Sequence, residues 1–201
     1  STFAHLTASD NLGDATEVIS NGASAGGHAT YLHADRITDM VHDANAAAGK
    51  PAATVVSLPD SGFWPDDPHE RFTGMFTNWF ALLGNDTRGL AKNCKWRETN
   101  ASKCLFPQYF ADEIETRLFP LQSLYDPLQA KMSKIDPNEH GKWLLDMINS
   151  TVVQTKRADG KPNGGYLYSC SRHCGGELIN IDGYTAPTAL ETFLSINAPG
   201  E

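Results

Sequence analysis

The chain has 201 residues, of which 40% are apolar and 20% are charged, proportions typical of a globular fold with a sizeable core. The formal net charge is −8, and the 16 Lys and Arg residues are dispersed rather than clustered, which argues against a nucleic-acid partner. No apolar run reaches the about 18 residues of a transmembrane helix, and no repeat of about 20–50 residues occurs. We therefore expect one globular domain, residues 1–201, with no transmembrane segment.

The first predicted elements are a strand, a tight turn, a helix and a second strand. Residues 17–21 (EVISN) form a short strand that enters residues 22–27 (GASAGG). Apolar residues then recur at spacings of three and four, which predicts a helix, and residues 49–51 (GKP) end it. Residues 54–58 (TVVSL) follow as a buried strand. This order of elements is typical of a parallel sheet.

An aromatic helix and an external excursion are predicted next. The helix carries on or near one side Phe72, Met75, Phe76, Trp79, Phe80 and Leu83. Core packing is the favoured role of this side, and an acyl-binding stripe is the alternative. Residues 85–108 contain one cysteine pair and two glycosylation sequons, which indicates an excursion stapled at its base.

The remaining elements complete the predicted sheet. Residues 118–123 (LFPLQS) resume it, and Asp126 lies just past the carboxyl end of this strand. An amphipathic helix covers about residues 140–154. Residues 165–169 (GYLYS) form a last strand that runs toward His173. The closing segment has the pattern of a packing helix.

The four cysteines fall into two close pairs, Cys94 with Cys104 and Cys170 with Cys174. Two disulfides are the simplest account of an even number of paired cysteines. A zinc site is the competing interpretation, but neither pair has two-residue spacing and no histidine lies at a finger-like offset. The sequence therefore predicts two disulfides and no metal.

Three sequons, at Asn85, Asn100 and Asn149, agree with an oxidising compartment. The first residue is Ser1 rather than Met, and no signal-peptide pattern precedes the fold. We therefore expect that an upstream segment has been removed. Together these features predict a secreted or cell-wall glycoprotein that passes through the secretory pathway.

Ser24 is the candidate nucleophile. It lies in the pattern G-x-S-x-G, with Gly22 and Gly26 as the small neighbours that a strained turn between strand and helix requires. The pattern alone is weak, because it occurs by chance in many chains of this size. Its position between a predicted strand and a predicted helix makes it informative.

Asp126 and His173 are the candidate acid and base. Each follows a predicted strand, and their order after Ser24 is the one that α/β-hydrolase folds use. His173 would take the proton from Ser24 and return it to the leaving alcohol, while Asp126 would set the imidazole tautomer. Asp60 is the alternative acid, although a supporting role that ties the following loop below the pocket is favoured for it.

An oxyanion hole needs two donors. The amide of Ala25, directly after the nucleophile, is one of them. The partner normally comes from a glycine-rich loop before the nucleophile strand, and residues 1–14 contain no such loop. The source of the second donor is therefore open.

These residues resemble the pectin acetylesterases and their animal relatives, the Notum deacylases. The resemblance spans about residues 15–195 and consists of several blocks in the family's order. The blocks are residues 22–27 (GASAGG) with Leu32 and Asp35, 60–63 (DSGF), Cys94 with 104–108 (CLFPQ), 121–126 (LQSLYD) with Gln129, and 169–174 (SCSRHC).

The resemblance implies an α/β-hydrolase fold, a mostly parallel sheet with helices on both faces. It also implies a carboxylic ester hydrolase that needs no cofactor or metal, with Ser24, Asp126 and His173 matching the family's triad and Ala25 its oxyanion amide. Family members have a further amino-terminal section, so the resemblance implies a partial catalytic domain with a long unpaired sheet edge. A separate amino-terminal polypeptide of the same enzyme is then a possible partner.

Three functions follow. The leading hypothesis is hydrolysis of acyl esters, chiefly acetyl esters on an extracellular or cell-wall polysaccharide, through an acyl-enzyme on Ser24. A protein or lipid O-deacylase of Notum type is the alternative within the enzyme class. The alternative from another class is a non-catalytic, extracellular glycan-binding or structural subunit on a hydrolase scaffold.

Overall fold

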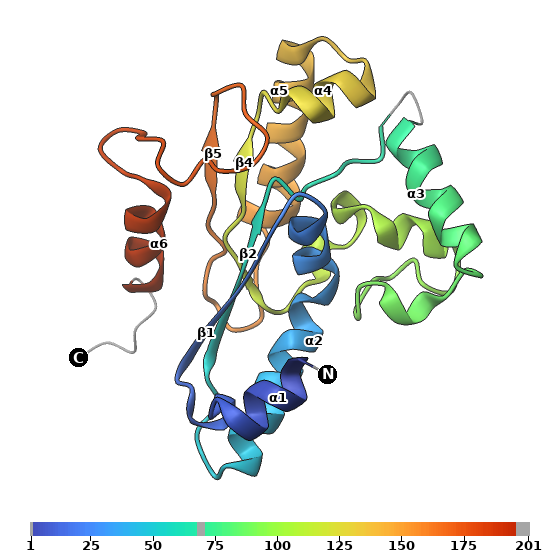
Figure 1. The fold of residues 1–201 in the computed structure, drawn as a ribbon. Helices are drawn as coiled ribbons and strands as arrows, with labels where there is room; N and C mark the ends of the chain where they lie inside the picture. Colours follow the sequence, from blue (N-terminus) through green and yellow to red (C-terminus); the bar gives the residue numbers. More distant parts are fainter. Residues whose placement is uncertain (1, 68–70, 196–201) are drawn as a thin grey trace.

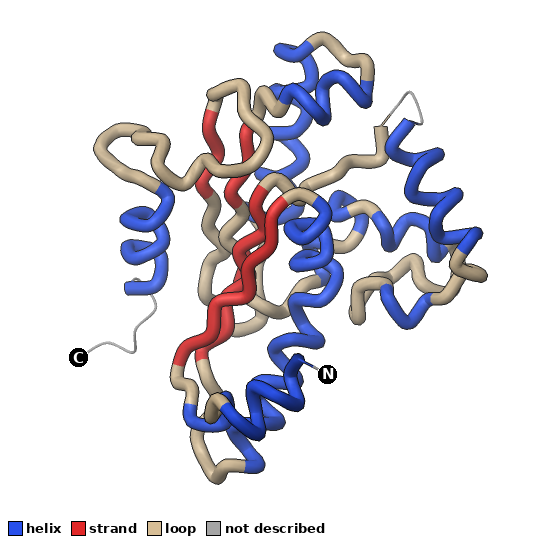
Figure 2. Tube along the Cα trace, in the orientation of Figure 1, coloured by secondary structure: helices blue, strands red, loops and turns tan. Residues whose placement is uncertain are grey.

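The described residues are built on a parallel five-stranded sheet (Figures 1 and 2). The computed structural model describes residues 2–67 and 71–195. Four strands lie in the order β1-β2-β4-β5, and β3 pairs with β2 beside this path. The strands are β1 (Glu17–Ala23), β2 (Thr54–Asp60), β3 (Arg117–Leu118), β4 (Leu121–Ser123) and β5 (Tyr166–Tyr168).

The described residues form six α-helices and several shorter helical turns before, between and after the strands. The α-helices are α1 (Thr2–Ser9), α2 (Ala25–Ala47), α3 (Arg71–Leu82), α4 (Pro127–Ser133), α5 (Pro137–Ile148) and α6 (Ala186–Ser195). The shorter turns are η1 (Leu12–Asp14), η2 (Thr87–Gly89), η3 (Ala101–Leu105), η4 (Pro107–Tyr109), η5 (Ala111–Glu113) and the π-turn η6 (Asn149–Val153). Within the described ranges, no helix combines the length and the apolar character needed to cross a bilayer.

Helices cover both faces of the sheet, as Figure 1 shows. Neighbouring residues of β2 face opposite ways, because side chains alternate along a strand. Val55 packs in a cluster with Val41 of α2, whereas Val56 packs in a cluster with Phe193 of α6. The predicted fold class is therefore confirmed, with α2 and α5 on one face and α6 on the other.

β1 forms one edge of the sheet. Among the described strands it pairs only with β2, in parallel register from Glu17 opposite Thr54 to Ala23 opposite Asp60. Its burial alternates along the strand, and Ile19 remains 44% exposed. This arrangement agrees with the expected open sheet edge.

Two of the differences from the predicted element boundaries have a clear local cause. The predicted strand at 118–123 is split into β3 and β4, since Pro120 has no N–H to donate to a strand ladder. The predicted helix at 140–154 begins earlier, at Pro137, because Asp136 caps it by accepting from the amides of Asn138 and Glu139. Pro137 at the first helical position suits this start.

The excursion after α3 is held by a disulfide between Cys94 and Cys104, as predicted. Cys104 is fully buried and belongs to the same core cluster as Phe110 and Leu144. The excursion consists mainly of short helical turns. It therefore packs as part of the core rather than as a detached surface loop.

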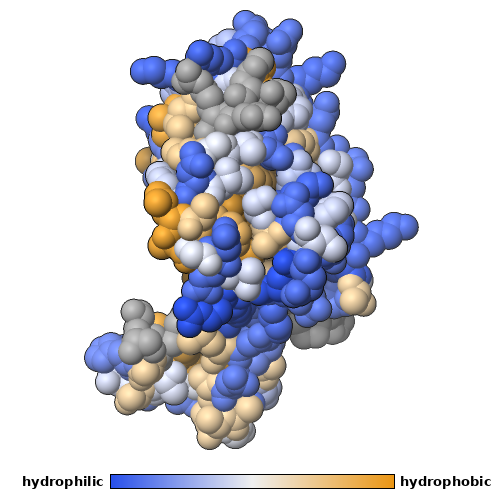
Figure 3. Space-filling view, turned by 90° about the vertical axis from the view of Figure 1, so that its right-hand side faces the viewer, coloured by the Kyte–Doolittle hydropathy of each residue, from blue (hydrophilic) through white to orange (hydrophobic). Residues whose placement is uncertain are grey.

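The aromatic helix α3 packs into the core on one side only. Phe72 and Phe80 are buried, whereas Trp79, Leu82 and Leu83 are 53%, 83% and 74% exposed. Figure 3 views the side of the molecule on which α3 lies, and apolar side chains gather there beside hydrophilic ones. The inner face of this helix is core, as favoured, and an acyl-binding role for its exposed apolar residues stays a prediction.

The predicted second disulfide is wrong, because Cys170 and Cys174 are free thiols. The carbonyl of Cys170 accepts a hydrogen bond from Ser123 at the end of β4. The amide of Cys174 donates to the Ser61 hydroxyl, which lies just after β2, at 2.9 Å. The backbone groups of the two cysteines are thus bonded to the ends of different strands, and their closeness in sequence does not produce a disulfide.

Candidate active site

Ser24 lies at a sharp turn between β1 and α2. Its φ of 57° and ψ of −119° are unusual for a residue with a side chain. The Ser24 amide donates to the carbonyl of Asp60 at 2.8 Å. A Cβ atom on Gly22 would lie 2.4 Å from the Gly26 carbonyl oxygen, whereas a Cβ on Gly26 would meet nothing within 4 Å. Of the two predicted small neighbours, Gly22 is therefore the one that the turn requires.

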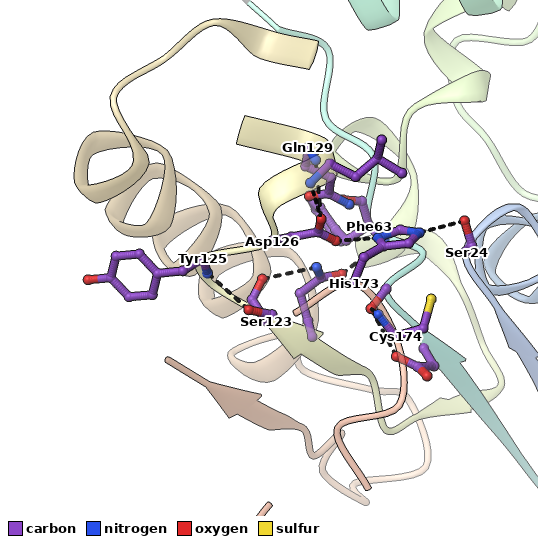
Figure 4. A network of polar contacts seen from close by, with 12 residues as sticks. Ser24, Phe63, Ser123, Tyr125, Asp126, Gln129, His173 and Cys174 are labelled. Carbon is purple, nitrogen blue, oxygen red and sulfur yellow. Dashed lines mark hydrogen bonds and ion pairs between the residues drawn. The ribbon is translucent and has the colours of Figure 1, made fainter. Parts of the chain in front are cut away.

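The structure brings Ser24, His173 and Asp126 into one line of hydrogen bonds (Figure 4). His173 Nε2 lies 2.8 Å from Ser24 Oγ, and His173 Nδ1 lies 2.6 Å from Asp126 Oδ2. An ionised carboxylate can only accept, so Nδ1 carries the proton and Nε2 is left to accept from the serine hydroxyl. The predicted chain order thus corresponds to a contiguous set of side chains.

Asp126 is fully buried and its carboxylate is held on both oxygens. Oδ1 accepts from the amides of Leu128 at 2.9 Å and Gln129 at 3.2 Å, as the N-cap of α4. Oδ2 faces His173. An N-cap carboxylate is held in place by the backbone N–H groups of the first helical turn. The first turn of α4 therefore orients the Asp126 carboxylate independently of its bond to His173.

Asp60, the alternative acid, is bonded through its two carboxylate oxygens to groups other than the His173 ring. Its Oδ1 accepts from the Ser61 hydroxyl at 2.9 Å and its Oδ2 accepts from the Gly175 amide at 3.1 Å. These bonds agree with the supporting role that was favoured for it.

Ala25, the predicted oxyanion donor, occupies the first position of α2, where an N–H has no acceptor within its own helix.

Trp64 is a residue of the site that the order of strands does not predict. It is 6% exposed, and its ring meets the His173 ring edge to face with 5.9 Å between centroids. Phe72 and Phe76 of α3 pack on the same indole at 4.9 and 6.2 Å. An aromatic wall therefore flanks the imidazole. The only signal for it is a tryptophan four residues after a strand end.

His28, one turn into α2 from Ser24, is buried and neutral. Burial lowers the pKa of His28 to about 4. Its Nε2 lies 2.7 Å from the carbonyl oxygen of Leu105 and so donates to it, and its ring packs edge to face on Phe76. His28 thereby fastens the disulfide-bonded excursion to the helix that begins at the nucleophile.

The other predicted site residues are not members of this line of hydrogen bonds. Asn85 and Asn100 are exposed and Asn149 is partly exposed, so glycosylation at these positions stays a prediction. Burial raises the pKa of the Cys174 thiol, which adjoins His173 in sequence. Within residues 2–67 and 71–195, no cluster of three His, Cys, Asp or Glu side chains is arranged to hold a metal ion.

Comparison with known protein families shows which family the chain belongs to. The family model described as Pectinacetylesterase matches residues 1–183. The chain belongs to the pectinacetylesterase family. Among curated members, pectin acetylesterase 11 of Arabidopsis thaliana is 26% identical over 90% of this chain and 50% of its own length. Pectin acetylesterase 5 of the same plant is 25% identical over 81% of this chain and 42% of its own.

Solved structures with the same fold include the Wnt deacylase Notum from Drosophila. One crystal form superposes with a TM-score of 0.72 at 22% identity, covering 96% of this chain and 58% of Notum. A second form gives a TM-score of 0.73 at 21% identity, covering 96% and 57%. The chain thus spans about half the length of the curated pectinacetylesterase relatives and somewhat more than half of Notum.

Proposed function

We propose that this member of the pectinacetylesterase family hydrolyses carboxylic esters through an acyl-enzyme on Ser24. The observation that carries the proposal is the hydrogen-bonded line from Ser24 through His173 to the buried Asp126. A serine hydroxyl is a weak nucleophile unless a base accepts its proton, and a base works only if a third group orients it. Family membership supports the same class of reaction.

In the proposed reaction His173 Nε2 accepts the Ser24 proton while Oγ attacks the ester carbonyl. Nδ1–H stays hydrogen-bonded to Asp126, which stabilises the imidazolium that forms. His173 then returns the proton to the leaving alcohol, and the acyl group remains on Ser24. A water molecule, deprotonated by the same nitrogen, releases the carboxylic acid and regenerates the serine.

The tetrahedral intermediate of each step carries a negative oxygen that needs donors. We assign the Ala25 amide as one donor, because it is the first N–H of α2 and the helix N-terminus favours negative charge. The second donor is proposed to come from polypeptide outside these 201 residues, since the curated relatives are about twice as long as the segment they share with this chain.

An acetyl ester on an extracellular or cell-wall polysaccharide is the proposed substrate. The names of the matched plant proteins, pectin acetylesterases, support it. Removal of a longer acyl chain is the second candidate, supported by the aromatic wall of Trp64, Phe72 and Phe76 next to His173 and by the name of the Notum neighbour. Rates on a series of 4-nitrophenyl esters of increasing chain length separate the two.

A secreted location is part of the proposal. The disulfide between Cys94 and Cys104 and the sequons at Asn85, Asn100 and Asn149 support passage through an oxidising secretory compartment. Release of the glycans by an endoglycosidase, followed as a drop in mass of the natively purified protein, tests this part independently of activity.

Fluorophosphonate labelling followed by peptide mapping tests the nucleophile. The natively purified protein should be labelled at Ser24, and Ser24→Ala should abolish both labelling and ester turnover while leaving the circular dichroism spectrum unchanged. Labelling at another serine would refute the assignment. A folded protein that neither labels nor turns over a short acyl ester would favour the non-catalytic, glycan-binding alternative.

A further inference from the structure

Residues 60–63, which we call the β2 corner, contact all three chain segments that carry Ser24, Asp126 and His173. The corner follows the carboxyl end of β2, and its Asp60, Ser61 and Phe63 are buried. Ser61 has a φ of 51°, a left-handed conformation that is costly for a residue with a side chain. A strained backbone conformation persists only where surrounding contacts hold it.

The corner first contacts the nucleophile turn. The Asp60 carbonyl accepts from the Ser24 amide at 2.8 Å. Gly62 packs directly on the first turn of α2, where a Cβ at Gly62 would lie 2.2 Å from the carbonyl carbon of Gly27. The backbone of the corner therefore contacts both the Ser24 amide and the first turn of α2, and so helps to fix the position of Ser24.

The corner next contacts the segment that leads to Asp126. The Ser61 amide donates to the Leu121 carbonyl at the start of β4 at 2.8 Å. The side chain of Gln129, fully buried in α4, donates to the Phe63 carbonyl at 3.1 Å (Figure 4). Both ends of the short segment that holds the acid are thus bonded to the corner.

The corner finally contacts the loop that carries His173, and these contacts are made by the side chains of Asp60 and Ser61. The Ser61 hydroxyl accepts from the Cys174 amide at 2.9 Å, and Asp60 Oδ2 accepts from the Gly175 amide at 3.1 Å. The same Ser61 hydroxyl donates to Asp60 Oδ1 at 2.9 Å. These two amides are the ones that directly follow His173, and the loop around them has no helix or strand of its own.

We propose that Asp60 and Ser61 are positioning residues that hold the loop of His173 so that its Nε2 stays within hydrogen-bond reach of Ser24. The proposal rests on the proposed function, because positioning matters only if His173 is the base. The reason is geometric. The His173 ring is fixed by Asp126 at one nitrogen, and the backbone that carries it is fixed by the corner. Displacement of a reacting group by about 1 Å can cost roughly 100-fold in rate.

The test compares Ser61→Ala and Ser61→Gly with Ser57→Ala in the full-length protein. Ser57 is a matched control, because it is a serine of β2 that is fully buried, as Ser61 is in the corner. Its hydroxyl bonds to the Ser20 hydroxyl at 2.8 Å and not to the loop of His173. Both Ser61 variants should lower kcat on 4-nitrophenyl acetate by roughly 10- to 100-fold with KM within about twofold of wild type. Ser57→Ala should stay within about twofold of wild type.

Hydrogen exchange of the Cys174 and Gly175 amides supplies a readout that does not depend on activity. Exchange in the peptide around His173 should speed up in both Ser61 variants and in Asp60→Asn, which loses the acceptor for Gly175, and should be unchanged in Ser57→Ala. Asp60→Asn keeps an oxygen for the Ser61 hydroxyl, so its kcat should fall less than that of Ser61→Ala.

Ser61→Gly distinguishes positioning from backbone strain. Glycine relieves the positive φ, so it should restore full activity if strain were the only issue. Wild-type kcat in Ser61→Gly, or unchanged exchange in the loop, would overturn the proposal, and this holds even if Ser61→Ala does not fold. Absence of wild-type turnover would instead refute the proposed function, while the exchange result would still decide whether the corner holds the loop.

Discussion

Ser24 combines an unfavourable backbone conformation with a complete set of local bonds. Its positive φ costs on the order of 1–3 kcal/mol. The hydrogen bond from the Ser24 amide to the Asp60 carbonyl and the close packing of Gly22 on Gly26 hold it in this conformation. This turn raises the hydroxyl to the level of His173. Local strain is thus maintained by contacts from β2, a neighbouring strand.

Asp126→Asn should lower kcat by about 10⁴-fold while the fold persists. An asparagine can donate to His173 Nδ1 and so favours the tautomer with a proton on Nε2, which can no longer accept from Ser24. Steady-state kinetics on a short acyl ester measures the effect. Asp136→Asn is the control, because Asp136 caps α5 in the same way but lies on the surface. Loss of less than tenfold in Asp126→Asn would contradict the assigned role.

At the scale of elements, the approach of α2 to the end of β2 depends on two glycines. A Cβ at Gly27 would lie 2.4 Å from the Asp60 carbonyl oxygen, and one at Gly62 would lie 2.2 Å from Gly27. Both clashes are with backbone atoms, which cannot rotate away. The close packing of helix on strand therefore fixes how near the nucleophile turn lies to the β2 corner.

Gly62→Ala should destabilise the fold by about 2 kcal/mol or more, since overpacking against backbone cannot be relieved by a rotamer change. Gly26→Ala is the matched control. It lies in the same turn with open space around its Cβ position and should be neutral or slightly stabilising, because alanine favours a helix. Urea unfolding midpoints measure both. Equal stability of the two variants would show that the corner can move away from α2.

The disulfide between Cys94 and Cys104 should contribute about 3 kcal/mol to the stability of the fold. The bond closes a loop with a sequence separation of 10, and restricting the unfolded chain over that length accounts for a value of this size. Replacing both cysteines by alanine should lower the urea midpoint accordingly. Cys170→Ala is the control, because that thiol is exposed and unpaired, and an equal loss there would argue against the assignment.

At the scale of the whole molecule, buried neutral histidines couple folding to pH. Burial lowers the pKa of His28 to about 4 and also lowers the pKa of His140. Between pH 6.5 and 4 the unfolded chain therefore binds protons that the folded chain does not. The free energy of unfolding should fall as the pH falls through this window, and for His28 alone the full loss is about 3 kcal/mol.

His28→Gln should weaken this acid sensitivity. Glutamine does not titrate, and its amide can still donate to the Leu105 carbonyl that His28 Nε2 meets. Unfolding free energies at pH 7 and pH 4.5 should differ less in the variant than in wild type, with a residual difference from His140. His5→Gln, a change at an exposed histidine, should leave the difference as it is. An unchanged difference in His28→Gln would refute the role of His28.

Much of the candidate site could be predicted from sequence, because its members follow strands in a fixed order. Ser24, Asp126 and His173 each stand just past a predicted strand, and parallel strands bring their carboxyl ends to one edge. Trp64 and the hydroxyl of Ser61 could not be predicted in this way. Their contacts with the His173 loop join positions more than 100 residues apart, and no local pattern records such a pairing.

The sequence by itself determined the parallel sheet, the turn at Ser24 and the disulfide of Cys94, since these follow from periodicity, small residues and spacing along the chain. Only the tertiary structure decided that Cys170 and Cys174 form no disulfide and that the Asp60 carboxylate bonds to the loop after His173. The physical reason is that a loop without regular structure takes its shape from whatever it bonds to. The loop of His173 bonds to the ends of β2 and β4.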